Sequence, residues 1–368
     1  MGKDRSSLLE QHRRDIEALD RRVLHLVRER QQLAAEVGEL KRSQGIPLRD
    51  FEVEAEVHER FRQGCRDLGL DPALGHDLAV FLIERSAEQQ AAVLDTVYQG
   101  NHLRCLVIGG KGGMGSWTAA FLGNQGHEVV IYDPAPGDSP YQQVETLQDG
   151  STAQLIVVAV PMTDCAMVLD ELASFGSDAV VAEMCSLKAH LEPTKARLRS
   201  AGMRIVSFHP LFGPDTRMLD GRVVLFCDDA PPEDLAVVKG LFESTTATLI
   251  DLDPAEHDRR MGLVLGMTHL SNFVFARGLS RSGVASDELR EVAGVTYRKQ
   301  MATTLEVSRE NPHLYHQIQA LNDITPDTAR WLTESIKDYV EASAGEDPAR
   351  FVELMTEGLD YLQTGRAS

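Results

Sequence analysis

The sequence predicts a multidomain fold in three parts: an all-helical module, an α/β domain with a doubly wound sheet, and a second all-helical domain. In the first hundred residues, apolar side chains recur at alternating spacings of three and four, the pattern of packed helices. Short apolar segments then alternate with helical stretches, an order typical of a parallel, doubly wound sheet with helices on both faces. From about residue 254 the helical pattern returns without clear strands. The expected domains are 1–98, 103–253 and 254–368.

The composition excludes several classes of function. The chain has 368 residues, with 56 acidic and 37 basic side chains and a formal net charge of −19, and 43% of its residues are hydrophobic. These values are typical of a globular protein with more than one core. The negative field disfavours binding to nucleic acid or to an anionic membrane. An anionic substrate therefore needs locally placed Arg or Lys.

The cysteine pattern and the lack of long apolar segments indicate the cellular compartment. No stretch of 18 uncharged apolar residues occurs, and the first 15 residues lack the apolar core of a signal peptide. Because the five cysteines show no C-x-x-C spacing, we expect neither a disulfide framework nor a metal site, and a cytoplasmic location fits. These cysteines are Cys65, Cys105, Cys165, Cys185 and Cys227.

The N-terminal module is expected to contain helices over about 6–44, 50–68 and 73–97. The first of these would be about 58 Å long at 1.5 Å per residue, too long to bury its apolar seam without a partner. We therefore expect it to pair with a second copy of the chain in a homodimer. The seam consists of Ile16, Leu19, Val23, Leu26, Leu33, Val37 and Leu40.

A glycine motif opens the α/β domain. Gly110, Gly112 and Gly115 form a G-x-G-x-x-G that follows an apolar strand and begins a helix, and Asp133 stands eighteen residues after the last glycine. In this context the glycines allow close backbone approach to a pyrophosphate, and the acid accepts from ribose hydroxyls. The pattern predicts a Rossmann-type site for NAD. It favours NAD over NADP because Asp133 repels a 2′-phosphate and no Arg follows it.

Two further strand ends carry candidate chemistry. His209 comes at the end of a strand and directly before Pro210, and ligands bind at the carboxyl ends of strands in such sheets. A histidine with a pKa near neutrality can take a hydroxyl proton while a hydride leaves. Ser186 and Lys188 follow the strand at 179–183 and are expected to face the same crevice.

These motifs, in order, carry a family resemblance. From Leu103 to its end, the chain resembles the prephenate dehydrogenase family, with C-S-L-K after a strand, H-P-L-F-G-P-D, E-H-D before a long helix, and Y-R followed by P-x-L-Y. The first hundred residues are similar to the all-helical chorismate mutase module. The whole chain thus resembles the bifunctional mutase–dehydrogenases of tyrosine biosynthesis.

The resemblance implies the roles of the dehydrogenase residues. It places the catalytic base at His209 with Ser186 beside it, and the arginine for the substrate carboxylate at Arg298. It also implies His269 near the substrate carboxyl and Tyr315 as an aromatic residue lining the site. Prephenate is a dianion, so a bidentate arginine is the cation that such an acidic protein needs there.

The helical seam contains one anomaly that agrees with the mutase resemblance. Arg30 falls inside the apolar stripe, and Lys41, eleven residues on, lies about 20° away around a 3.6-residue helix. A buried guanidinium usually meets an anion, so the two predict an anion pocket. Arg13 points about 100° away from Arg30, which suits a pocket in a partner chain.

The mutase resemblance implies a fuller substrate site and shows one departure from the family pattern. It implies Lys41 and Gln90 as the groups that stabilise the breaking ether oxygen, and Arg13 as donated by the other subunit. Val53 stands where the family usually has an arginine, directly before a glutamate. The implied substrate-binding residues are Arg13, Arg30, Asp50, Glu54 and Ser86.

The resemblance implies conversion of chorismate to prephenate, and NAD-dependent oxidation of prephenate to 4-hydroxyphenylpyruvate, by a cytoplasmic homodimer. Two alternatives stay open because of Val53. The same chemistry could act on 4-amino-4-deoxy analogues in a secondary pathway. Alternatively, the helical module could be an inactive dimerisation element for a dehydrogenase.

Overall fold

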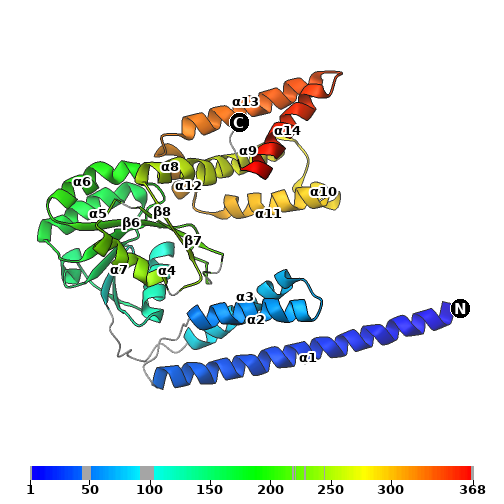
Figure 1. Ribbon diagram of the computed structural model, residues 1–368, viewed down its shortest axis with the longest axis horizontal. Helices are drawn as coiled ribbons and strands as arrows, with labels where there is room; N and C mark the ends of the chain where they lie inside the picture. Colours follow the sequence, from blue (N-terminus) through cyan, green and yellow to red (C-terminus); the bar gives the residue numbers. More distant parts are fainter. Residues whose placement is uncertain are drawn as a thin grey trace. The chain divides into compact units, whose positions relative to one another are not determined.

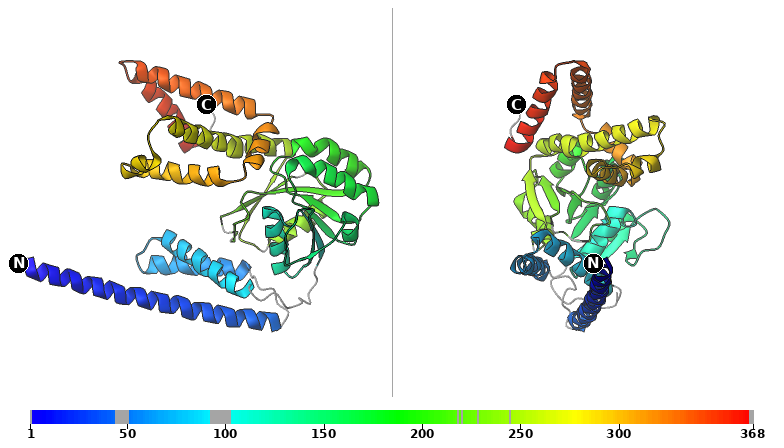
Figure 2. Two further views of the ribbon diagram at one scale, coloured as in Figure 1. Left: turned by 180° about the vertical axis from the view of Figure 1, so that it is seen from behind. Right: turned by 90° about the vertical axis from the view of Figure 1, so that its right-hand side faces the viewer.

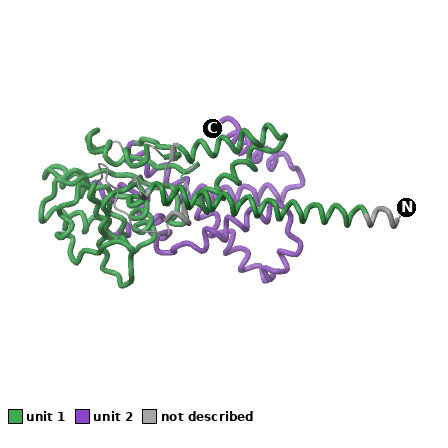
Figure 3. The backbone as a smooth tube through the Cα atoms, turned by 90° about the horizontal axis from the view of Figure 1, so that it is seen from below, with its two compact units in different colours: residues 1–160, 164–185, 193–252 green, residues 161–163, 186–192, 253–368 purple. Residues whose placement is uncertain are grey.

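The computed structural model describes residues 2–43, 51–91, 103–217, 219, 221–227, 229–243 and 245–365. The chain divides into two compact units, coloured separately in Figure 3. Unit 1 comprises 1–160, 164–185 and 193–252, and unit 2 comprises 161–163, 186–192 and 253–368. The segment 186–192, which follows a strand of unit 1, thus packs with the C-terminal helices.

Three helices form the N-terminal module, as the spacing predicts (Figure 1): α1 (Gly2–Ser43), α2 (Phe51–Asp67) and α3 (Pro72–Ala91). The turn between α2 and α3 uses Gly69 at φ 70° and Asp71, whose carboxylate accepts from the backbone N–H of Ala73 at 2.9 Å. The expected continuation of α3 to residue 97 lies outside the described residues. Much of the seam of α1 is exposed, with Leu19 53% and Leu33 62% accessible.

An eight-stranded sheet forms the centre of unit 1, in the order β3-β2-β1-β4-β5-β6-β7-β8. Helices cover both of its faces, as Figure 2 shows. The glycine-loop helix α4 (Gly113–Asn124) and α7 (Pro232–Glu243) share one core with the strands, and α5 (Met162–Phe175) and α6 (Glu192–Ser200) bury Leu169 and Leu198. The strands are β1 (Arg104–Ile108), β2 (Glu128–Tyr132), β3 (Gln142–Gln143), β4 (Leu155–Val158), β5 (Val180–Glu183), β6 (Arg204–Pro210), β7 (Val223–Cys227) and β8 (Thr248–Leu252).

The doubly wound α/β fold is confirmed, and the structure adds two details that the sequence pattern does not predict. First, β6 and β7 pair antiparallel, whereas the alternation of strands and helices predicts a parallel sheet. The physical reason is the connection 211–222, in which the described residues form no crossover helix of the kind that parallel neighbours need. Second, β3 and β8 join the sheet at its edges, where their side chains are mostly exposed and give little apolar signal.

Unit 2 is helical apart from its turns. α8 (Pro254–Met261) begins at Asp253, whose side chain accepts from the N–H groups of Ala255 and Glu256. A π-helical turn, Gly262–Met267, leads into α9 (Thr268–Arg281). The remaining helices are α10 (Ser286–Glu291), α11 (Val295–Arg309), α12 (Pro312–Ala320), α13 (Thr325–Ala344) and α14 (Ala349–Thr364).

No helix within the described ranges combines the length and apolar character that a membrane span requires.

Candidate active sites

The glycine loop is shaped so that only residues without a Cβ fit its critical positions. Gly109 has φ 81°, and a Cβ on Gly115 would lie 1.9 Å from the carbonyl oxygen of Gly109. A Cβ on Gly110 would lie 2.5 Å from that of Ile131, and one on Gly112 would lie 3.2 Å from the Gly109 oxygen. The loop therefore holds the N-terminus of α4 against β1 and β2, with backbone free for close approach. This geometry fits the pyrophosphate of a dinucleotide.

Asp133 closes the same loop at the end of β2. Its two oxygens accept from the N–H groups of Lys111 and Ala135, each at 2.9 Å, and the side chain is only 7% exposed. Each carboxylate oxygen keeps further acceptor capacity for ribose hydroxyls. Lys111, which stands inside the glycine motif, donates from Nζ to the carbonyl of Ala135 at 2.7 Å. The structure thus places a cation, the ammonium group of Lys111, in the loop where the sequence pattern indicated only an acid, Asp133.

His209 lies near the carboxyl end of β6 and is 5% exposed. Ser207, two residues earlier, shares its face of the strand and accepts from Nζ of Lys195 at 2.7 Å. Lys195 has no exposed side-chain surface and lies 2.9 Å from Asp229, which also pairs with Arg199. No motif signals this buried cluster, because its members meet only when α6 packs on the sheet.

The Asp229 carboxyl is held in its ionised form by this cluster. Burial alone would raise the pKa of Asp229, but hydrogen bonds from Arg199 and Lys195 outweigh burial and hold its pKa below the usual value. The cluster therefore places an ionised carboxylate, paired with Lys195 and Arg199, next to the strand that carries His209.

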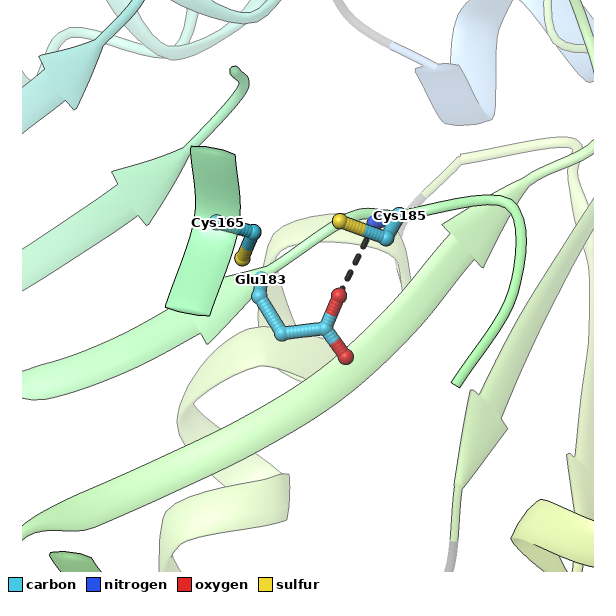
Figure 4. Close-up of side chains that lie close together, drawn as sticks. All are labelled: Cys165, Glu183 and Cys185. Atoms are coloured by element: carbon cyan, nitrogen blue, oxygen red, sulfur yellow. Dashed lines mark hydrogen bonds between the residues drawn. The ribbon is translucent and has the colours of Figure 1, made fainter. Parts of the chain in front are cut away.

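A compact group of buried thiols and one carboxylate lies at the end of β5 (Figure 4). Ligand atoms of Cys165, Glu183 and Cys185 lie within 4.8 Å of one another, and Glu183 accepts from the backbone N–H of Cys185 at 2.9 Å. The sequence predicts no metal site, and among the described residues this group offers three ligands, one short of a closed tetrahedral zinc set. Cys165 belongs to α5, and we interpret the group as the contact between α5 and the turn that ends β5.

Ser186 follows that turn and belongs to unit 2. Its side chain is half-buried between Cys185 and Leu187, which are 5% and 0% exposed, and Lys188 is also fully buried. Within 185–188, Ser186 is therefore the one residue that is partly exposed.

Unit 2 also contains the three predicted substrate residues on its helices. His269 on α9 and Tyr315 on α12 lie in contact, with ring centroids 4.3 Å apart, and Phe273 packs against both. Arg298 on α11 has an exposed side chain and is not drawn into this aromatic group. Tyr315, Phe273 and Glu310 are among the residues lining a cavity of ≈400 Å³.

The aromatic group holds both titratable side chains neutral. Burial lowers the pKa of His269, whose Nδ1 is buried and has no hydrogen-bond partner within the described structure. Burial, followed by the charge of Glu310, raises the pKa of Tyr315. A neutral histidine with an unsatisfied ring nitrogen is suited to donate to, or accept from, a ligand.

In the helical module, Arg30 is partly buried between α1 and α3. Its Nη1 donates to Oγ of Ser86 at 2.6 Å and to the carbonyl oxygen of Leu82 at 2.8 Å. Burial, followed by the charge of Arg60, lowers the pKa of Arg30. The two sequence-predicted residues Arg30 and Ser86 therefore form one polar site on facing helices.

The other predicted mutase residues are placed less completely. Glu54 is 8% exposed on α2, Lys41 is half-buried on α1, and Arg13 is exposed. Val53, beside Glu54, is 49% exposed. Asp50 lies outside the described residues, as does the side chain of Gln90.

Comparison with known families covers most of the chain. The model for chorismate mutase type II matches residues 12–91, that for the prephenate dehydrogenase nucleotide-binding domain matches 126–251, and that for the prephenate dehydrogenase dimerization domain matches 253–357. The order of the three matches is the order of the helical module, the sheet and the C-terminal helices.

Individual relatives agree with these matches. The T-protein of Enterobacter agglomerans is 28% identical over 306 residues, which are 83% of this chain and 80% of that protein. The chorismate mutase of Methanocaldococcus jannaschii is 33% identical over 89 residues, which are 24% of this chain and 90% of that protein. The prephenate dehydrogenase of A. aeolicus, solved with hydroxyphenyl propionate and NAD+, has the same fold with a TM-score of 0.56 and 18% identity, over 70% of this chain and 97% of that chain.

The helical module with its Arg30–Ser86 site, the glycine loop and the three family matches lead to one assignment. The chain belongs to the bifunctional family that joins a type II chorismate mutase to a prephenate dehydrogenase.

Proposed function

We propose that this protein rearranges chorismate to prephenate in its helical module and oxidises prephenate with NAD in the rest of the chain. The single observation that carries the proposal is the joint occurrence, in one chain, of a partly buried guanidinium site between α1 and α3 and a glycine loop shaped for a dinucleotide. The family matches support both halves.

The mutase reaction needs no covalent catalyst. The helical site holds the folded substrate, and Arg30, already oriented by Ser86, pairs with a carboxylate. Lys41 and Gln90 stabilise charge on the breaking ether oxygen. Glu54 and Asp50 complete the site, and Arg13 reaches it from the second subunit.

In the dehydrogenase reaction, Gly110, Gly112, Gly115 and Asp133 hold NAD. NAD, when bound, supplies the acceptor for a hydride from ring carbon C4 of prephenate. His209 removes the proton of the C4 hydroxyl, so that this oxygen becomes a carbonyl. Loss of the ring carboxyl as carbon dioxide then sends its electron pair through the ring to this oxygen, which takes back a proton to become the phenol hydroxyl. The aromatic ring makes the step irreversible.

The remaining predicted residues orient the dianion. Arg298 forms a bidentate pair with a substrate carboxylate, and neutral His269 contributes a hydrogen bond near it. Tyr315 packs beside His269 and gives the substrate ring an aromatic surface. Ser186 adds a hydroxyl to the groups that take part in this reaction.

A homodimer in the cytoplasm is the assembly that we propose for this activity. The exposed seam of α1, with Ile16 57% and Val23 57% accessible, supports it because so long an apolar stripe needs a covering partner. The match to the dimerization-domain model over 253–357 supports a second contact through unit 2. We assign residues 1–98, 103–253 and 254–368 to the mutase, nucleotide-binding and dimerisation domains.

A second candidate substrate class rests on Val53. A hydrocarbon where the family has an arginine leaves the mutase site with one cation fewer, which keeps 4-amino-4-deoxychorismate open as the substrate. The same observation leaves open an inactive module that serves dimerisation alone.

One set of assays on the full chain separates these readings. Chorismate consumption without NAD reports the mutase, and NADH formation from prephenate reports the dehydrogenase. We expect both with the hydroxyl substrates. Turnover of the 4-amino analogues alone would reassign the substrate, and prephenate oxidation without chorismate consumption would make the module a scaffold.

A further inference from the structure

A buried carboxylate in unit 2 holds the segment that carries Ser186. Asp258 on α8 is 7% exposed, and its two oxygens accept from the backbone N–H of Lys188 at 2.9 and 3.0 Å. One of them also accepts from the N–H of Ala189 at 2.8 Å. Residues 186–192 therefore belong to unit 2 through bonds to a side chain seventy positions later (Figure 3).

These bonds give an acceptor to backbone N–H groups at the start of a short helix. Lys188 is the residue before a short 3-10 helix, Ala189–Leu191, and its own side chain does not cap that helix. The N–H groups that open a helix have no partner within it, so a buried start requires an acceptor from elsewhere. Asp258 supplies that acceptor as a charged group, which forms shorter and stronger hydrogen bonds than a neutral one.

Neighbouring side chains also hold Asp258 in place. His257 has no exposed surface, and its Nδ1 lies 2.7 Å from the Asp258 carboxylate, which assigns the ring proton to that nitrogen. Nδ2 of Asn322 donates to the main-chain oxygen of Asp258 at 2.8 Å. A Cβ on Gly262 would lie 2.2 Å from the side chain of Ile324, so the helices here approach as closely as glycine allows.

The charge state of Asp258 is fixed by these contacts. Burial alone would raise its pKa, but hydrogen bonds from His257, Ala189 and Lys188 outweigh burial and keep the pKa below its usual value. The anchor is therefore an anion throughout the neutral range.

We propose that Asp258 is a positioning residue of the dehydrogenase that acts through Ser186. It fixes the backbone at Lys188, two residues after Ser186, and thereby fixes the position of the Ser186 hydroxyl. This inference rests on the proposed function, in which Ser186 contributes a hydroxyl to the dehydrogenase reaction. Displacement of a catalytic group by about 1 Å can cost about 100-fold in rate, so the rigidity of this anchor bears on the chemical step. Asp258 itself touches neither substrate nor cofactor in this assignment.

A double-mutant cycle on the full chain tests the proposal. Asp258→Asn keeps the shape but replaces one acceptor oxygen with a donor that faces backbone N–H groups. We expect it to lower kcat for prephenate oxidation about 10- to 100-fold, with KM for NAD unchanged. In a Ser186→Ala background the same change should lower kcat by no more than about threefold, because the group that it misplaces is already absent.

The matched control is Asp253→Asn on the same helix. Asp253 caps Ala255 and Glu256 and lies outside the Ser186 segment, so its variant makes the same carboxylate-to-amide change at a helix start and should keep kcat within about twofold. Mutase activity and NAD binding of each variant show that the chain is folded. If Asp258→Asn loses NAD binding, the cycle is run with Asp258→Glu, which keeps the charge and moves it by one methylene.

Equal losses from the Asp258 change in both backgrounds, or no loss in either, would overturn the proposal. These outcomes are distinct from failure of the proposed function, which would appear as a wild-type chain that does not oxidise prephenate.

Discussion

The guanidinium of Arg30 donates a 2.6 Å hydrogen bond to the hydroxyl of Ser86, fifty-six positions later in the chain. Ser86 in turn donates to the carbonyl oxygen of Leu82 at 2.8 Å, which Arg30 also contacts. Two side chains that the sequence marks separately are thus joined in one site, and the arginine is oriented before any substrate arrives. Preorganisation of this kind reduces the cost of binding an anion.

Replacing Arg30 by Ala should abolish the mutase and spare the dehydrogenase. Removing one partner of a desolvated ion pair costs about 2–5 kcal/mol, so kcat/KM for chorismate should fall at least about 30-fold. Prephenate oxidation should change by less than about twofold, since the two reactions use different domains.

The control for this prediction is Arg28→Ala, an exposed arginine on the same helix, which should leave both activities unchanged. Loss of both reactions in Arg30→Ala, with wild-type behaviour in the control, would make Arg30 a structural residue.

Replacing His209 by Asn should keep NAD binding and lower the rate of prephenate oxidation by about 10²–10⁴-fold, the usual contribution of a general base. The reason is its position at the end of β6, 5% exposed, where it can take a hydroxyl proton. Steady-state kinetics together with a fluorescence titration of NADH separate the two effects. A near-wild-type kcat would remove His209 from its assigned role.

Replacing Asp133 by Ser should reduce the preference for NAD over NADP. The carboxylate that accepts from ribose hydroxyls would be lost, and we expect kcat/KM for NAD to fall about 10- to 100-fold. Lys111, whose Nζ lies 2.7 Å from the carbonyl of Ala135, would then be the nearby cation for a 2′-phosphate. The measurement is the ratio of kcat/KM values for NAD and NADP, and a wild-type preference for NADP would contradict the assignment of this loop.

The sequence predicts the order of the domains and the glycine loop well, because these depend on local signals. A strand that runs into G-x-G-x-x-G and an apolar seam at helical spacing are each readable within a few tens of residues. The antiparallel pairing of β6 with β7 is not readable in this way, since it depends on the path of a connection that carries no periodic pattern.

The candidate sites show the same distinction. Arg30 stands out in the sequence because a charge interrupts an apolar stripe, whereas Asp258 acts through residues seventy positions away and carries no local signal of that task. The Lys195–Asp229 pair is likewise invisible until α6 packs on the sheet. Long-range polar contacts of buried groups are therefore what the sequence pattern leaves out.

Replacing Asp229 by Asn should destabilise the sheet domain by about 3–5 kcal/mol, because the change removes the anion that fully buried Lys195 contacts. Since the folded pKa of Asp229 is depressed, its stabilisation is fully present above the unfolded pKa of about 4 and is lost as pH falls through the folded value. The difference in urea midpoint between wild type and variant should be constant from about pH 5 to pH 8 and shrink below about pH 4. A difference that does not depend on pH would show that the charge of Asp229 contributes nothing.

Replacing Val53 by Arg should strengthen chorismate binding if the module is a mutase that lacks one cation. Val53 is 49% exposed beside Glu54, so a longer side chain can be accommodated without overpacking the core. A charge-assisted bidentate contact contributes about 2–4 kcal/mol, so KM for chorismate should fall about 30-fold or more. Prephenate oxidation, which depends on other residues, should stay unchanged.

The matched control for this substitution is Val53→Lys, which adds the same charge without the planar fork and should give the smaller gain. An equal effect of Arg and Lys would indicate general attraction of a dianion to added charge. No gain in chorismate binding with Arg, combined with turnover of the 4-amino analogue by the wild type, would show that Val53 adapts the site to a different substrate. The two variants thus decide whether Val53 weakens the mutase site or adapts it to a different substrate.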